Sequence, residues 1–372
     1  MNRQFILFTI LVFFTGLYLG TLRIVIPVIE RHLDIAVTLS IFLPLVIFGF
    51  TKGGFNYLAG KLSDDLGRKL VLIIGWIAAL SSIILFFYVN IYSIIIITVF
   101  LAINQALTWT TTVTSQIDIS GKSRAGLASG INEMSGYFGV AVGNLFATYI
   151  FRLSYVFIFT VAIVALISSI LAIDTKKLLK DTIIGKTKIN YSSITKTSIA
   201  GLLEKFVDSS FFILIPTYLL LLHYSLFLIG VIVASYTLTW AVLQPLFGYI
   251  ADISNQRRLI ITIGFFLMFL GFFHYTVYPL VFSIMEGIGM SMIYPNLIAL
   301  VNDEIHESVR GKALGYYRLY RDSGYGVAGL ILPLLYSFFG FNYALLIVGT
   351  FQLISIFLII DVNVFKHVTK NM

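Results

Sequence analysis

Two groups of charged residues stand out in a chain that is otherwise apolar. The first is the stretch GKLSDDLGRK at residues 60–69, in which five of ten residues are charged although charged residues make up 11% of the chain. Gly60 and Gly67 permit a tight turn and a close approach of helices, and Asp64 can bind the positive N-terminal end of a neighbouring helix. A charge cluster that forms in one conformation and breaks in another would act as a switch.

The second group lies in the stretch YRLYRDSGY at residues 317–325. Its ionisable side chains are spaced i, i+3, i+4 and i+7, so on a helix they share one face. They are Arg318, Arg321, Asp322 and Tyr325. Two interpretations stay open. The four side chains form a salt-bridged stripe among themselves, or they bind substrate, carry protons or form switch contacts.

Other polar side chains also fall inside apolar segments, where an ionised group costs about 2.5 kcal/mol or more in hydrocarbon. They are therefore expected to face protein or water, which makes them candidates for substrate binding or proton coupling. For Arg23, and for Glu204 and Lys205, a contact with lipid headgroups is the alternative. The candidates are Arg23, Lys52, Asn132, Glu133, Asp208, Glu286, Arg318, Arg321 and Asp322.

The surrounding composition is that of a membrane protein. Hydrophobic residues make up 59% of the chain, charged residues 11%, and the mean hydropathy is +0.96, whereas soluble domains are roughly 45–50% apolar and 25% charged. Between Lys69 and Asp118 lie 48 consecutive residues without Asp, Glu, Lys, Arg or His. A helix needs about 20 residues to cross the hydrocarbon core. This run must therefore cross twice, with a turn near residues 89–92.

The same criterion predicts an all-α integral membrane protein with twelve transmembrane helices. The first span is not a cleaved signal peptide, because its apolar run exceeds the usual length of about 7–15 residues and no small-residue cleavage pattern follows it. A turn between the ninth and tenth spans depends on Tyr278 and Pro279. The predicted spans are residues 5–29, 38–58, 70–88, 92–114, 127–150, 155–173, 197–222, 229–250, 259–277, 280–300, 313–338 and 341–364.

Lys and Arg are distributed unevenly between alternate connections. With the N-terminus in the cytoplasm, eighteen basic residues lie inside and two, Arg31 and Arg152, lie outside. The positive-inside rule then predicts cytoplasmic termini, and we expect the plasma membrane as the location. The inner residues are Arg3, Lys61, Arg68, Lys69, Lys122, Arg124, Lys176, Lys177, Lys180, Lys186, Lys188, Lys196, Arg257, Arg258, Arg310, Lys312, Lys366 and Lys370.

The chain contains an internal repeat. The stretch 60–69 recurs as GYIADISNQRR at 248–258, where the first Gly, the Asp and the basic pair Lys69 and Arg257 are each displaced by 188 positions. The tripeptide SGY at 135–137 recurs at the same distance. The repeat indicates a duplicated six-helix unit. The predicted domains are an N-terminal bundle at 1–173, a cytoplasmic linker at 174–196 and a C-terminal bundle at 197–372.

At this point the chain resembles a known family. GKLSDDLGRK is similar to the signature G-x-L-a-D-r-x-G-r-[RK] between helices two and three of major facilitator superfamily transporters, and the second copy lies where that family has a degenerate one. The resemblance covers essentially the whole chain and implies two six-helix bundles around a central solute site that opens alternately to each side. It also implies that Asp64 lies near Gly311 and Lys312, at the start of helix eleven. The implied gate residues are Gly60, Asp64, Gly67, Arg68, Lys69, Gly248, Asp252 and Arg257.

The resemblance further implies that helices two and eleven adjoin, so we expect Asp322 to face Lys52. Glu133 lies 188 residues before Arg321, which predicts opposite charges at equivalent depth on helices five and eleven. A carboxylate that moves a proton needs a pKa near ambient pH, which burial raises and a nearby cation lowers. Glu133 and Asp322 meet this requirement best. Glu133 has no basic residue within four positions, so its partner must come from another helix or from the substrate.

Two departures from the family's exporters argue against an antibiotic exporter. The stretch GYFGVAVG at 136–143 lacks the proline of G-x-x-x-G-P-x-x-G-G in helix five, and FLAINQALTW at 100–109 lacks the arginine of helix four. A mixture of cationic and anionic cavity residues suits an anionic or zwitterionic metabolite, whereas an aromatic cavity suits amphiphiles. The sequence does not choose between them.

The expected function is secondary active transport of a small organic solute by alternating access, coupled to a proton or another ion. We expect a monomer in the lipid bilayer, without cofactor, metal or nucleic-acid partner. The alternative is a membrane sensor or scaffold of the same fold, which would be expected to carry an added soluble domain. Primary pumping is disfavoured because no G-x-x-x-x-G-K-[ST] phosphate loop occurs, and a membrane metalloenzyme is disfavoured because the five histidines are scattered, so we do not expect an enzyme. The absence of cysteine excludes disulfides and thiolate metal sites.

Overall fold

The computed structural model describes residues 2–32, 37–88, 90–149, 153–178, 189–275 and 277–360. In this part of the chain the fold consists of eleven α-helices, and some of the described connections contain 3-10 turns. The helices are α1 (Arg3–His32), α2 (Val37–Leu66), α3 (Arg68–Ile83), α4 (Ile91–Ser120), α5 (Ala125–Tyr149), α6 (Ser154–Leu171), α7 (Tyr191–Leu221), α8 (Leu226–Ser254), α9 (Arg257–His274), α10 (Pro279–Asp303) and α11 (Arg310–Ile359).

Local sequence explains where several helices begin. Asn90 caps α4 in a capping box, because its side chain accepts a hydrogen bond from the Ser93 amide (3.0 Å) while the Ser93 hydroxyl accepts one from the Asn90 amide (2.8 Å). Pro279 occupies the first turn of α10, where its missing N–H is not needed. The turn expected at Tyr278–Pro279 is therefore confirmed, and α4 begins within the turn expected near residues 89–92, of which residue 89 lies outside the described part of the chain.

The last two predicted spans form one continuous element. α11 contains 50 residues, and at Gly340 the backbone leaves the helical conformation (φ 72°). Only glycine adopts this left-handed region without a steric cost. Because the chain turns there, the segments 313–338 and 341–359 lie on either side of Gly340, which is why eleven helices correspond to twelve predicted spans.

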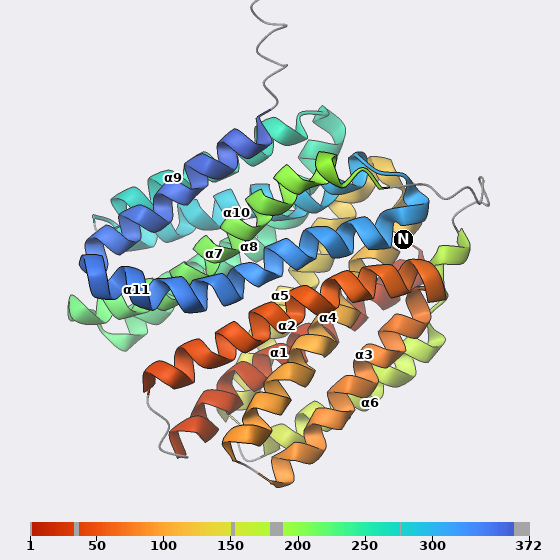
Figure 1. Cartoon of the computed structure of the whole chain (residues 1–372), viewed down its shortest axis with the longest axis horizontal. Helices are drawn as coiled ribbons and strands as arrows, with labels where there is room; N and C mark the ends of the chain where they lie inside the picture. Colours follow the sequence, from red (N-terminus) through yellow and green to blue (C-terminus); the bar gives the residue numbers. More distant parts are fainter. Residues whose placement is uncertain are drawn as a thin grey trace, which may run out of the picture.

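The helices form two groups that lie side by side (Figure 1). Helices α1–α6 make up one group and α7–α11 the other, with α2 and α11 adjacent along the boundary. Contacts repeat between the groups: α1 packs on α5 as α7 packs on α11, and α2 packs on α4 as α8 packs on α10. Across the boundary α2 packs on α11 and α5 packs on α8. This arrangement has the pseudo-symmetry that the sequence repeat predicts.

The surface of the protein suits a lipid bilayer. Phe227 and Phe357 each expose 81% of their surface, and many other large apolar side chains are exposed along the helices. Among the described residues, eight helices are long and apolar enough to cross a membrane by length and composition. The remaining three, α2, α5 and α7, carry ionisable residues near their centres, which lowers their hydropathy.

Several residues used in the topology prediction lie outside the described part of the chain. They are Arg152, Lys180, Lys186, Lys188, Lys366 and Lys370, together with most of the predicted linker and the end of the last predicted span.

Candidate functional site

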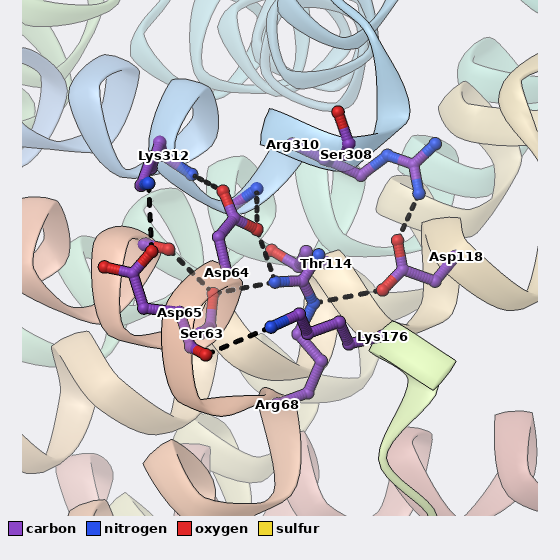
Figure 2. A network of polar contacts seen from close by, with 12 residues as sticks. Ser63, Asp64, Asp65, Arg68, Thr114, Asp118, Lys176, Ser308, Arg310 and Lys312 are labelled. Atoms are coloured by element: carbon purple, nitrogen blue, oxygen red, sulfur yellow. Dashed lines mark hydrogen bonds and ion pairs between the residues drawn. The ribbon is translucent and has the colours of Figure 1, made fainter. Parts of the chain in front are cut away.

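The carboxylate of Asp64, at the end of α2, binds the beginning of α11 (Figure 2). Its Oδ1 atom accepts a hydrogen bond from the Gly311 amide (3.0 Å), and Oδ2 accepts one from the Lys312 amide (2.7 Å). The Arg68 guanidinium donates to Oδ1 at 2.6 Å. An anion at a helix N-terminus is stabilised by the unpaired amides and by the helix dipole. We call Asp64, Arg68, Gly311 and Lys312 the first capping cluster, which confirms the predicted contact at the start of α11.

The two glycines of the motif have separate roles. A Cβ atom on Gly60 would lie 2.1 Å from the Gly311 carbonyl oxygen, so only glycine lets α2 approach α11 this closely. Gly67 has φ 102° and forms the turn between α2 and α3. Lys69 follows this turn and is partly exposed, whereas Arg68 is buried.

A second capping cluster joins α8 to α5 in the same way. The Asp252 carboxylate accepts hydrogen bonds from the Gly126 amide (3.0 Å) and the Leu127 amide (2.8 Å), and Arg257 donates to it at 2.8 Å. A Cβ atom on Gly248 would lie 2.2 Å from the Gly126 carbonyl oxygen. The second copy of the repeat therefore keeps the contact between an aspartate and a helix beginning as well as the sequence. The repeat could have indicated α5 as the partner of Asp252.

The structure corrects one correspondence within the repeat. Arg257 binds the capping carboxylate as Arg68 does, so its counterpart is Arg68 and not Lys69. Gly67 matches Asn255, since both have a positive φ (102° and 54°) at the turn. The second copy contains one additional residue, Gln256, between this turn position and the arginine, and a fixed offset of 188 therefore misaligns the basic residues.

Asp118 is a member of this region that the sequence analysis missed. It is buried at the end of α4, accepts a hydrogen bond from Arg68 Nε (3.0 Å) and forms an ion pair with Arg310 (Figure 2). The Thr175 hydroxyl donates to it at 3.0 Å. Asp118 is the first acidic residue after the 48-residue uncharged run, and this position could have identified it as a candidate member of the gate.

A second set of charges, the central charge cluster, surrounds the middle of α11. Glu133 on α5 accepts hydrogen bonds from Arg318 Nη2 (2.7 Å) and from the Trp109 indole nitrogen (2.9 Å). Glu133 and Arg318 are 0% and 1% exposed. Of the two expected sources for the partner of Glu133, another helix or the substrate, the structure shows the first, and the partner is Arg318 of α11.

Arg321 binds Glu204 of α7 with two parallel hydrogen bonds, from Nε (2.8 Å) and Nη2 (3.1 Å). Its guanidinium stacks 3.4 Å from the centre of the Tyr294 ring and also donates to Asp322 (3.0 Å). A bidentate pair with a stacked ring holds the guanidinium in one orientation.

Asp322 connects α11 to α2. Lys52 Nζ lies 3.2 Å from Asp322 Oδ2, and the Asn56 amide donates to the same oxygen at 2.7 Å. The predicted pairing of Lys52 with Asp322 is therefore confirmed. The ionisable face of α11 is not a self-contained stripe, because Arg318, Arg321 and Asp322 each bind a residue on a different helix.

The headgroup interpretation of Glu204 and Lys205 is wrong. Both side chains are fully buried, and Lys205 Nζ lies 2.7 Å from Asp208 Oδ2. Asp208 also accepts a hydrogen bond from the Tyr236 hydroxyl (2.6 Å). The Lys205 ammonium lies 4.9 Å from the centre of the Tyr325 ring, an arrangement that stabilises a desolvated cation.

Some buried polar groups have no hydrogen-bond partner among the described residues. They include both carboxylate oxygens of Glu286, the side-chain amide of Asn132, and the Nε and Nη1 atoms of Arg318. Glu286 packs against α9, where a Cβ atom on Gly271 would lie 2.4 Å from its Cγ atom. Unpaired buried groups are costly, so such groups need water, a proton or a solute.

Arg23 on α1 lines a cavity of about 280 Å³ that is formed by α1, α2 and α4 together with Tyr325 of α11. Groups of three or more potential metal ligands are absent from the part of the chain that the structure describes. The site thus consists of two capping clusters, a central charge cluster and one cavity.

A sequence model of the Major Facilitator Superfamily matches residues 8–192 and 197–371. The chain belongs to the Major Facilitator Superfamily. Membership points to a multi-pass membrane transporter rather than an enzyme. No curated protein matches the chain by sequence.

Solved structures of superfamily members share the fold. The human organic anion transporter MFSD10 (TETRAN) superposes with a TM-score of 0.81 at 11% identity, over 97% of this chain and 100% of that chain. The transporter FucP in its outward conformation superposes with a TM-score of 0.76 at 11% identity, over 96% and 98%. At this identity the similarity shows the superfamily fold, and the particular solute must be inferred from the side chains of this member.

Proposed function

We propose that the protein is a secondary active transporter that moves a small organic solute across the membrane by alternating access. The observation that carries this proposal is the pair of capping clusters. Asp64 and Asp252 each bind the beginning of a helix in the opposite group, and close approaches of α2 to α11 and of α5 to α8 at glycines lie beside them. Both contacts are local, polar and reversible, which suits a gate that opens when the groups move apart.

The central charge cluster supports coupling to a proton. Glu133–Arg318 and Lys52–Asp322 join helices of opposite groups, so movement of one group against the other separates Glu133 from Arg318 and Asp322 from Lys52. Asp322 keeps its ion pair with Arg321 on the same helix, so Glu133 is the carboxylate that loses its cation. A carboxylate left without a cation in a dry environment takes up a proton, and it releases the proton when the cation returns. Proton transfer and the change of access would then be linked through the same side chains.

The proposal retains the domain division at 1–173, 174–196 and 197–372, a monomer in the plasma membrane, and cytoplasmic termini. The support for this orientation is the excess of Lys and Arg in alternate connections. The capping clusters would then close the cytoplasmic side. The fold neighbour MFSD10 is described as an organic anion transporter, which agrees in class with a solute that meets cationic side chains.

Uptake of a panel of organic anions, zwitterions, cations and neutral solutes into proteoliposomes, with and without an imposed pH gradient, tests the proposal. The same uptake would be measured in the double variant Asp65→Cys/Lys312→Cys, with the reduced protein as the matched control. The Asp65 and Lys312 side chains form an ion pair (3.0 Å) at the first capping cluster, to which Lys312 contributes its backbone amide, and the chain has no other cysteine. A short, cleavable thiol cross-linker should stop uptake, and reduction should restore it. Solute binding without any cross-link-sensitive uptake would favour a non-transporting sensor and contradict the proposal.

A further inference from the structure

Arg23 differs from the other cations inside the helices. Lys52, Lys205, Arg318 and Arg321 each form an ion pair with a buried carboxylate. Arg23 makes no ion pair or hydrogen bond with any residue that the structure describes, and its side chain is exposed. A guanidinium within a membrane-spanning helix is costly without an anionic partner. No described residue supplies that partner, so the Arg23 guanidinium is available to an anionic solute.

The residues that line the cavity beside Arg23 indicate the other chemical properties of its anionic partner. Most of its wall is apolar, and α1, α2 and α4 all contribute to it. Arg23 is the one charged residue among its described lining residues, and Thr98 and Tyr325 are the hydroxyl-bearing ones. Thr98 already donates its hydroxyl proton to the Ile94 carbonyl (2.9 Å). The apolar lining residues are Leu19, Leu22, Ile26, Pro27, Pro44, Leu45, Phe48 and Leu101.

Two further cations lie behind the aromatic wall of the cavity. Lys52 Nζ is 5.6 Å from the centre of the Phe48 ring and 5.8 Å from that of Tyr325, and Lys205 Nζ is 4.9 Å from Tyr325. Their carboxylate partners, Asp322 and Asp208, do not line the cavity. Because Lys52 and Lys205 are each paired with a carboxylate, they add little net charge to this wall, and Arg23 is the charge that favours an anion.

We propose that this cavity binds an organic monoanion, whose anionic group is held by the Arg23 guanidinium and whose apolar body packs against the walls around Phe48 and Leu45. The proposal rests on the transport function proposed above and names the substrate class for it. Guanidinium binds carboxylate and similar groups through two parallel hydrogen bonds, which gives geometric selection as well as attraction. A second charge or further hydroxyl groups on the solute would lose hydration against apolar walls without a compensating partner.

The test uses purified, full-length protein in a neutral detergent, with 4-phenylbutyrate as the probe and isothermal titration calorimetry as the readout. The uncharged 4-phenylbutanol and the cationic 4-phenylbutylamine have the same apolar body. We expect 4-phenylbutyrate to bind at least about tenfold more tightly than either, as one charge-assisted interaction implies. Equal affinity for the alcohol and the carboxylate would overturn the proposal.

Substitutions of cavity residues test whether 4-phenylbutyrate binds in this cavity. Arg23→Gln should weaken 4-phenylbutyrate binding at least about tenfold, and Arg23→Lys should weaken it less because it keeps the charge. Leu45→Trp should block binding by filling the cavity while leaving Arg23 in place. Arg124→Gln is the matched control, since Arg124 is also exposed but lines a different cavity beside α4 and α5. Wild-type affinity in Arg23→Gln, or lost affinity in Arg124→Gln alone, would place the anion elsewhere and refute the inference.

A lipid phosphate is a second source of the same anionic group, and added phosphatidylglycerol distinguishes the two. Unchanged affinity for 4-phenylbutyrate supports the solute site, whereas competition by phosphatidylglycerol that depends on Arg23 assigns this residue to lipid and overturns the proposal. Cross-link-sensitive uptake confined to cationic or neutral solutes would reject the anion site while leaving the transport function intact. Arg23-dependent binding without uptake of any solute would support the site and reject transport.

Discussion

Replacing Asp64 by Asn should shift the protein away from the arrangement in which α2 and α11 are joined. The substitution keeps the shape of the side chain and removes its charge. The Gly311 and Lys312 amides donate to different oxygens of Asp64, and Asn has an oxygen at only one of these two positions, so in the same side-chain conformation it keeps one of the two hydrogen bonds. Its NH₂ group then faces the other amide and the Arg68 guanidinium, which are also donors.

The size of the effect follows from these contacts. Loss of one charge-assisted hydrogen bond costs about 1.5–3 kcal/mol, and loss of a negative charge at a helix N-terminus costs about 0.3–1 kcal/mol more. The sum, about 2–4 kcal/mol, changes the equilibrium between the joined and separated arrangements roughly 30- to 1000-fold. Arg68 keeps its ion pair with Asp118 in the variant, so folding should be largely preserved.

Electron–electron distance measurements between spin labels can detect this shift. Lys61→Cys and Ser308→Cys place labels on exposed positions at the end of α2 and just before α11, in a chain that otherwise has no cysteine. Asp65→Asn is the matched control, because Asp65 forms an ion pair with Lys312 at 3.0 Å while remaining 44% exposed. Such an exposed pair contributes about 0–1 kcal/mol, which is less than about a fivefold change.

In Asp64→Asn we expect a large population of longer distances, and in Asp65→Asn a distribution close to that of the parent protein. If both variants give the parent distribution at equal thermal stability, the first capping cluster does not hold the two groups together and the reasoning fails. A long-distance population of similar size in both variants would show that general charge loss, and not helix capping, causes the change.

Three further predictions concern coupling and topology. Glu133→Gln should abolish accumulation driven by a pH gradient but spare solute exchange, because the Gln side chain cannot carry a proton; retained pH-driven uptake would remove Glu133 from coupling. Asp322→Asn should slow both accumulation and exchange, with partial recovery in Asp322→Asn/Lys52→Met, since an unpaired buried lysine costs more than a neutral pair; equal rates in the single and double variants would exclude the pair as a switch contact. Lys186→Cys should react with a membrane-impermeant maleimide only in opened cells, and labelling of intact cells would invert the predicted topology.

The first capping cluster could be predicted because the residues of its motif determine the local backbone geometry. Gly60, Asp64 and Gly67 specify a close approach, an anion and a turn within eight positions, and such short-range constraints are present in the sequence. The pairing of Lys52 with Asp322 was also predicted, since it follows from two adjoining helices and equal depth. In both cases the number of possible partners was small.

Pairings within the central charge cluster could not be predicted in the same way. The repeat predicts that Glu133 and Arg321 lie at equivalent depth, but it does not identify the partner of Glu133, because one helical turn separates Arg318 from Arg321 and a small rotation of α11 decides between them. The headgroup interpretation of Glu204 failed for a related reason. Position along a helix indicates depth in the membrane, whereas the direction of a side chain depends on how neighbouring helices pack. That packing places Glu204 against Arg321.

The reciprocal capping of helices has a consequence for how such a protein can arise. In each cluster one group supplies the carboxylate and the other supplies the helix beginning, so neither group completes a cluster alone. Two copies of one six-helix subunit, related by a twofold axis, would form both clusters from a single self-complementary surface, which is an isologous interface. After fusion, the two copies can diverge in sequence. Arg23 and the buried carboxylates can then change in one copy while both capping clusters are kept. The duplicated chain is in this sense a homodimer whose subunits have become unequal.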